Sequence, residues 1–197
     1  MKPSAMLALC LLGAAAAMPA SAITTIYTAT LSGSAESPPN ASPGTGNATV
    51  TVDTTANTME VQVTFANLTI PDTAAHIHCC TASPGTGTAG VATVTPTFTG
   101  FPGGVTSGTY DHTFDMTLAS SYNPAFVTAN GGTPASAFAA LVAGLNAGDA
   151  YLNIHTTQFP GGEIRGFLNA VPEPETYALM GVGLGLVGWA TRRRRVH

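Results

Sequence analysis

The stretch AHIHCC, residues 75–80, gathers the side chains of this sequence that are best suited to chemistry. His76 and His78 are separated by one residue and are followed directly by Cys79 and Cys80. Imidazole and thiolate are the ligands that zinc and copper prefer in proteins. The stretch therefore predicts either a metal site or a β-strand that carries polar residues on its solvent face.

A third histidine, His155, lies in a second strand-like segment, AYLNIHT, residues 150–156. Successive side chains of a strand point to opposite faces, so a buried Ile77 turns His76 and His78 outward. A buried Ile154 likewise turns His155 outward. If the two strands are neighbours, the three imidazoles converge on one exposed patch with an open position, which predicts a zinc or copper site. The alternative is three solvated histidines on a polar strand face.

The two adjacent cysteines allow several states. Cys10 is removed with the N-terminal leader described below, which leaves Cys79 and Cys80 in the exported chain. An even pair in an oxidising compartment favours a disulfide. Adjacent Cα atoms are ~3.8 Å apart, below the usual ~4.4–6.8 Å, so the ring would be strained. The alternatives are free thiols, with Cys79 buried, or metal thiolates; we favour the disulfide or simple burial.

Arg165 is the only basic residue between residues 23 and 170. Such a residue in an acidic region is expected to have a carboxylate partner. Glu163 lies two residues earlier, on the same face of the predicted strand. We therefore expect a structural ion pair between Glu163 and Arg165 that organises the last hairpin.

The segments that must position these residues are mostly β-strands. Thr and Val are frequent, and short apolar runs are cut by Gly and Pro turns. Strands are predicted at 25–31, 47–53, 59–65, 74–79, 90–97, 109–118, 150–156 and 163–169. One helix is predicted at 133–148, with Thr133 as N-cap, Pro134 in the first turn and Gly148 past its end. The fold class is therefore mainly β: an antiparallel β-sandwich or barrel-like domain of about eight strands with one short helix. His112, in YDHTFD, is expected to be half-buried.

Two removable hydrophobic segments flank this domain. Residues 1–22 combine Lys2, an apolar run and the cleavage pattern ASA, which predicts a secretory signal peptide. Residues 171–197 contain a short apolar run that ends in four arginines, Arg192 to Arg195. This pattern predicts a short transmembrane helix whose arginines stay in the cytoplasm. The domain between them covers 23–170.

The charge of the 23–170 region excludes one class of partner. It contains eight acidic residues and one arginine, so its formal charge is −7 (1 − 8). The whole-chain value of −4 includes the arginines of the tail. A surface of this charge repels nucleic acid, so we expect no nucleic-acid partner.

The tail resembles the PEP-CTERM sorting signal of Gram-negative bacteria. The matching parts are Val171, Pro172, Glu173 and Pro174, then the apolar run, then the arginine cluster. The resemblance implies export, transient anchoring in the inner membrane, cleavage by an exosortase and release to the cell surface or extracellular matrix. We therefore expect a place in biofilm or exopolysaccharide-associated structure, with extracellular polysaccharide as the candidate partner.

Residues 27–168 resemble the CHRD domain, first named in chordin. The matching pieces are ATLSGSAESPPNASPGTGNATVTVD, MEVQVTFANL, AHIH and AYLNIHTTQFPGGEIRGFL. The resemblance implies a β-sandwich-like extracellular module with no established catalytic role. Because the sequence also shows no nucleophile or phosphate-loop motif, we expect a non-enzymatic surface or matrix module. The alternative is an extracellular metal-binding (Zn or Cu) or redox protein that uses the histidine patch.

The sorting signal generates the first prediction. In a host with an exosortase, the mature protein should start near Ile23 and lack Arg192 to Arg195, as intact-mass measurement of secreted protein will check. Replacing Pro172 and Glu173 with alanine should leave the precursor in the membrane, because the protease would recognise that box. A secreted protein that retains the four arginines would contradict this processing.

Overall fold

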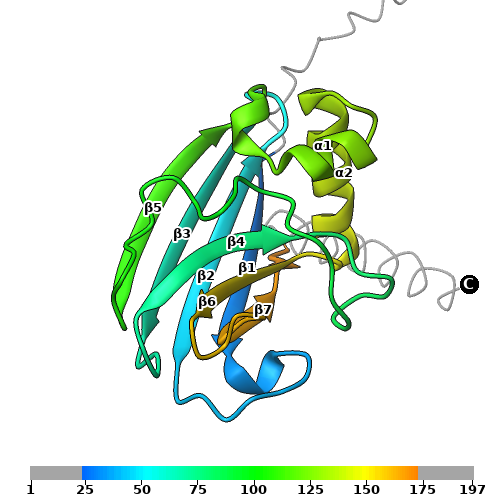
Figure 1. The fold of residues 1–197 in the computed structure, drawn as a ribbon. Coiled ribbons are helices and arrows are strands. Elements are labelled where there is room, and N and C mark those ends of the chain that lie inside the picture. Colours follow the sequence, from blue (N-terminus) through cyan, green and yellow to red (C-terminus); the bar gives the residue numbers. More distant parts are fainter. Residues whose placement is uncertain (1–23, 173–197) are drawn as a thin grey trace, which may run out of the picture.

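The computed structural model describes residues 24–172, so the predicted signal peptide and most of the predicted tail lie outside the described residues. Eight antiparallel strands form one sheet that curls into a half-barrel, in the order β4-β6-β7-β1-β2-β3-β5, with β8 paired to β1 (Figure 1). The strands are β1 (Thr24–Ser32), β2 (Thr45–Asp53), β3 (Thr58–Ala66), β4 (Asp72–His78), β5 (Gly108–Asp115), β6 (Tyr151–Thr156), β7 (Ile164–Phe167) and β8 (Asn169–Ala170). The mainly-β prediction is confirmed.

Strands β1, β2, β3 and β5 alternate between a buried and an exposed face. In β3, for example, Val61 and Val63 are buried whereas Gln62 and Thr64 are exposed. This period-two pattern is typical of strands that cover a core on one side only. Threonine is common on the outer face, where a β-branched polar side chain suits both the strand and water.

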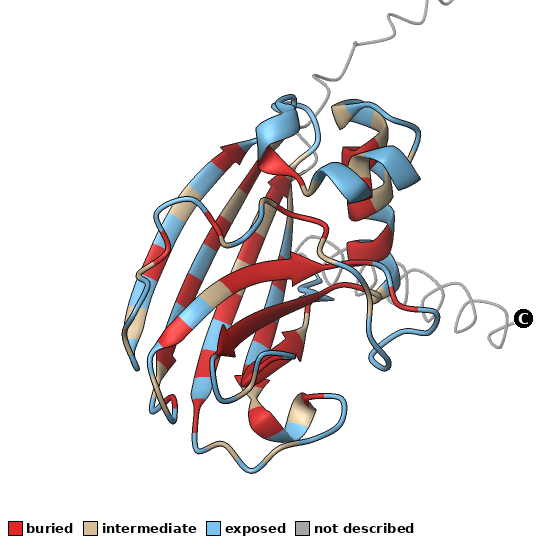
Figure 2. Cartoon of the chain, viewed as in Figure 1, coloured by how far each residue is buried: buried red, intermediate tan, exposed pale blue. Residues whose placement is uncertain are grey.

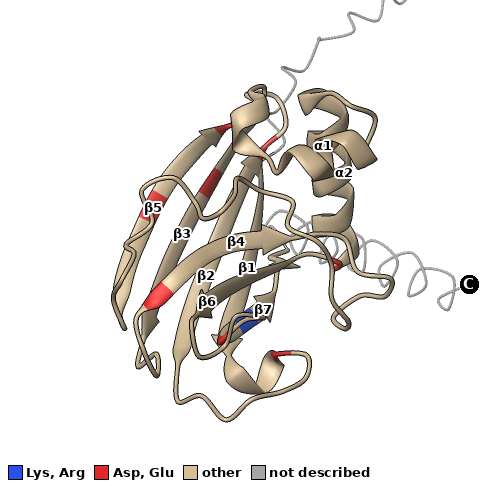
Figure 3. Ribbon diagram, in the orientation of Figure 1, with Lys and Arg blue, Asp and Glu red and all other residues tan. Residues whose placement is uncertain are grey.

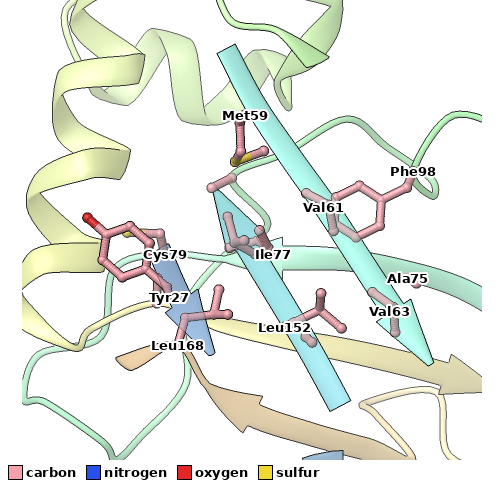
Figure 4. Packing of buried hydrophobic residues seen from close by; sticks show 14 of the residues in the cluster. Tyr27, Met59, Val61, Val63, Ala75, Ile77, Cys79, Phe98, Leu152 and Leu168 are labelled. Carbon is pink, nitrogen blue, oxygen red and sulfur yellow. The ribbon is translucent and has the colours of Figure 1, made fainter. Parts of the chain in front are cut away.

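Strands β4 and β6 are different, because both of their faces are buried. In Figure 2 they are coloured as buried along most of their length, whereas the strands behind them alternate. Their inner face packs into the core: Ile77 of β4 and Leu152 of β6 belong to the same buried cluster as Val61 of β3 (Figure 4). Because the sheet curls, its inner face encloses the core. The histidines of β4 and β6 lie on the outer face of these strands.

The segment that follows β4 covers part of this outer face. It runs back along the strand, where the Ala92 amide donates to the Ile77 carbonyl at 2.9 Å and the Phe98 amide donates to the Ala75 carbonyl at 2.9 Å. The prediction of a strand at 90–97 was wrong, because the segment makes only isolated bridges. Pro96 has no N–H, which is one reason that a regular ladder does not continue.

Two helices stand at one end of the half-barrel, α1 (Pro124–Ala129) and α2 (Pro134–Ala147) (Figure 1). Helix α2 is the predicted one, with Thr133 as N-cap and Gly148 in the left-handed conformation at φ 74°. The prediction of one helix was wrong, because six-residue α1 is too short to show helical periodicity. Its signal was Asn123, which caps the helix, followed by proline. No helix within residues 24–172 is long and apolar enough to cross a membrane.

Helix α2 packs against the two cysteines that end β4. Cys79 and Cys80 are joined by a disulfide, and Cys79 belongs to the hydrophobic core. A Cβ atom added to Gly144 of α2 would overlap both sulfur atoms. The glycine therefore lets the helix approach the disulfide closely.

This contact generates the second prediction. Alanine at position 144 gains about 1 kcal/mol of helix propensity, but overpacking a core typically costs about 1–3 kcal/mol. Because its methyl group would overlap two sulfurs held by a disulfide, we expect Gly144→Ala to lower the free energy of unfolding. Urea denaturation checks this, with Gly103→Ala as control, since a Cβ there meets nothing within 4 Å. Equal or higher stability of Gly144→Ala would contradict the packing.

Candidate metal centre

The pairing of β4 with β6 brings the three predicted histidines together. The two strands are hydrogen-bonded neighbours in which His76 lies opposite Asn153 and Ala74 lies opposite His155. The ring centroids are 4.7 Å apart for His76 and His78, 4.6 Å for His76 and His155, and 5.7 Å for His78 and His155. One ligand nitrogen from each ring lies within 4.8 Å of the others.

The histidines are buried, so the expectation of an exposed patch was wrong. The exposed fractions of His76, His78 and His155 are 7%, 9% and 8%. The sequence pattern identified the outer face of β4 and β6 correctly, but this face does not meet solvent. Loop residues from 79–98 and 157–162 lie against it, as their hydrogen bonds to the rings show.

Each ring is oriented by one hydrogen bond from its Nδ1 atom. The acceptors are the backbone carbonyls of Pro96 at 3.2 Å, Ala89 at 2.8 Å and Pro160 at 3.0 Å, for His76, His78 and His155 respectively. Because a carbonyl oxygen only accepts, each Nδ1 carries the proton. The Nε2 atom of each neutral ring is therefore a free lone pair, and none of the three has a hydrogen-bond partner.

The surroundings keep the rings neutral. The pKa of His76 is lowered to about 3, mainly by burial and also by the charges of His155 and His78. Burial is also the main cause that lowers the pKa of His78 to about 4, and it lowers the pKa of His155. All three histidines are thus deprotonated at Nε2 at neutral pH, which is the form that binds a metal ion.

The arrangement has the features of a three-histidine metal centre. Three Nε2 atoms without a hydrogen-bond partner belong to one cluster, and each Nδ1–H is held by a backbone carbonyl, a partner that typically fixes the tautomer of a metal-bound histidine. A buried polar atom without a partner normally costs about 1–3 kcal/mol. One ion bound to all three nitrogens would remove three such costs at once, so the residues present fit a transition metal.

The cysteines take no part in this cluster. Although Cys79 follows His78 directly, its side chain faces the core and Gly144, on the other side of the strand. The sulfurs are bonded to each other rather than left as thiolates. Among the described residues, the cluster consists of the three histidines alone.

Arg165 is paired with a different carboxylate from the one expected. Its Nε atom lies 3.7 Å from Glu36 Oε2, and it donates to the carbonyls of Ala35 at 2.6 Å and, through Nη1, of Gly87 at 2.9 Å. The predicted partner, Glu163, instead accepts hydrogen bonds from the Ser42 hydroxyl and the Thr69 amide. The prediction failed because Glu163 precedes β7 and its carboxylate is held by Ser42 and Thr69 instead. Arg165 is the only lysine or arginine within residues 24–172, and in Figure 3 the Lys and Arg colour appears at β7, which carries it.

Two further polar residues near the histidines, Tyr151 and Asn153, are buried as well. The Tyr151 ring stacks on the His78 ring, with centroids 4.7 Å apart. The Arg165 guanidinium lies 4.7 Å from the centroid of the Tyr151 ring. Asn153, only 1% exposed, sits opposite His76. Glu36, whose pKa burial raises to about 7, was not singled out at all. The only sequence signal for these buried polar residues was the unusual density of polar side chains in the segment AYLNIHT, residues 150–156.

Two family models match this chain. Residues 27–168 match the CHRD domain, and the chain belongs to this family. Residues 170–195 match the PEP-CTERM protein-sorting motif, which implies processing by an exosortase and export to the cell surface. Of the sorting box, Val171 and Pro172 are described and exposed, whereas Glu173 and Pro174 lie outside the described residues. Neither the curated proteins nor the solved structures contain a significant match.

The low pKa values of the histidines generate a third prediction. Unfolded histidines bind protons below about pH 6.5, whereas the folded His76 and His78 rings stay neutral to about pH 4 or lower. The unfolded state therefore binds more protons in this window, so the stability of the metal-free protein should fall as pH decreases from about 6.5 to 4. Urea denaturation at a series of pH values measures this slope.

A variant isolates the histidines from other titrating groups. Glu36 acts in the opposite direction between about pH 4.5 and 7, because its folded pKa is raised. His76→Gln removes one group that takes up a proton on unfolding. The pH dependence of the free energy of unfolding should therefore become shallower by about 1.4 kcal/mol per pH unit. His112→Gln is the control, since His112 is half-buried on β5 between Tyr110 and Phe114. An unchanged slope in His76→Gln would contradict the assigned neutral state.

Proposed function

We propose that this protein is a non-enzymatic surface module that holds one transition-metal ion outside the cell. His76, His78 and His155 would be the protein ligands. The single observation that carries the proposal is a buried cluster in which one ring nitrogen of each histidine lies within 4.8 Å of the others, while every Nε2 atom lacks a hydrogen-bond partner. Imidazole nitrogen is a ligand for zinc and copper, so these are the candidate metals.

The setting of the cluster favours binding over catalysis. The Nε2 atoms are shielded from solvent, and loops 79–98 and 157–162 are hydrogen-bonded to the same rings. Catalytic metals usually keep a position open to water or substrate, whereas structural or storage sites are closed. A covered cluster therefore suits a module that stores, buffers or is stabilised by its ion.

The sorting motif supplies the location in this proposal. An exosortase-sorted protein reaches the cell surface. There it is exposed to metal ions whose concentration the cytoplasm does not control. We propose that the module lies in the surface matrix, with polysaccharide as its neighbour, because the sorting motif implies delivery to the cell surface. The described domain is strongly acidic, and its carboxylates are spread over several elements (Figure 3), which suits solubility outside the cell.

The fourth prediction tests metal binding directly. The full chain, purified in detergent and dialysed against zinc or copper, should retain one ion per chain by elemental analysis. Binding should raise the unfolding temperature, because the ion binds only the folded state. His155→Gln should weaken binding by on the order of 100-fold or more, since it removes one of three ligands.

Controls separate metal loss from misfolding. His112→Gln should retain the ion, because this histidine lies on β5 and does not belong to the cluster. The circular dichroism spectrum of metal-free His155→Gln should match that of the metal-free parent protein. Loss of metal by both variants alike, or no metal in the parent protein, would refute the proposed centre.

A further inference from the structure

We propose that the ion preferred by the His76, His78 and His155 cluster is monovalent copper, Cu(I), rather than a divalent ion. This inference rests on the proposed metal-binding function and goes beyond it by assigning the charge of the ion. Three features carry it: the number of ligands, the absence of an anionic ligand in the cluster, and the charges around it.

The first feature is the ligand count. Among the described residues, three histidines form the cluster, and no cysteine, aspartate or glutamate joins them. Structural zinc sites are almost always four-coordinate, and Cu(II) favours four ligands in a tetragonal arrangement. Cu(I) has a filled d shell and accepts three nitrogen ligands in a plane. Because the Nε2 atoms are shielded from solvent, a water molecule has no ready route to a fourth position.

The second feature is the neutrality of the ligands and of the groups behind them. Each imidazole is uncharged, and each Nδ1–H donates to a backbone carbonyl rather than to a carboxylate. A carboxylate in that position would add negative charge to its histidine and support a more highly charged ion. Three neutral carbonyls provide no such compensation.

The third feature is a positive charge close to His78. The Arg165 guanidinium lies 4.7 Å from the Tyr151 ring centroid, and the Tyr151 ring is stacked on that of His78. Glu36, 3.7 Å from Arg165, balances the guanidinium but does not make the region negative. The cost of burying an ion rises with the square of its charge, so a divalent ion costs about four times as much as a monovalent one. In a neutral, buried cluster this difference favours Cu(I).

The experiment compares the two charges on the same protein. The full chain, purified in detergent with its disulfide intact, is titrated under argon against the Cu(I)–bicinchoninate complex, with ascorbate keeping the copper reduced. A parallel titration uses Zn(II) and a chromogenic zinc chelator. We expect transfer of one Cu(I) per chain and a dissociation constant at least about 100-fold lower than that for Zn(II).

A charged variant tests the cause of this preference. His155→Asp replaces a neutral ligand with a carboxylate, a harder and anionic donor. It should weaken Cu(I) binding and narrow or reverse the preference over Zn(II), whereas His112→Asp should leave both affinities unchanged. His155→Gln, which removes the ligand without adding charge, should weaken both metals and keep the Cu(I) preference.

Each outcome decides a separate claim. Tight Zn(II) binding with weaker Cu(I) binding would overturn the charge assignment and leave the metal centre standing. Binding of neither ion by a folded parent protein would overturn both. An unchanged preference in a folded His155→Asp would show that ligand charge does not set the selectivity, and would overturn the argument made here for Cu(I).

Discussion

His76, His78 and His155 each donate an Nδ1–H to a backbone carbonyl, and those three carbonyls belong to the loops that cover strands β4 and β6. One set of hydrogen bonds therefore does two things. It leaves every Nε2 lone pair free within one cluster, and it holds the loops over the outer face of the strands. Without these bonds the rings would rotate toward water, and the lone pairs would be hydrated rather than gathered.

Arg165 extends the same arrangement. Its guanidinium donates to Ala35 and to Gly87, in two segments far apart in sequence, and stacks on Tyr151 of β6. The Gly87 carbonyl lies two residues before Ala89, whose carbonyl orients His78. The lone basic residue of the domain thus helps to position a loop that shapes the histidine cluster. Removing it would leave Glu36 buried without its cation, a loss that usually exceeds the net value of the ion pair.

The sequence predicts much of this fold because its local patterns agree with one another. The alternation in β3 and the caps of α2 depend only on neighbouring residues, and both were predictable. The alternation of side chains along each strand also predicted that the three histidines lie on the outer face. Their burial was not predictable, because it depends on where residues 79–98 and 157–162 fold. The partner of Arg165 was missed for the same reason: Glu36 is 129 positions away (165 − 36), beyond any local pattern.

The central claim is that three imidazole nitrogens converge on one metal ion, and X-ray absorption spectroscopy of the metal-loaded protein tests it most directly. The account predicts a first shell of nitrogen at about 2.0 Å with the outer-shell scattering of three imidazole rings, and no sulfur. A first shell of oxygen alone would contradict it, since the ion would then sit on surface carboxylates. A sulfur contribution would also contradict it, because Cys79 and Cys80 are bonded to each other in this structure.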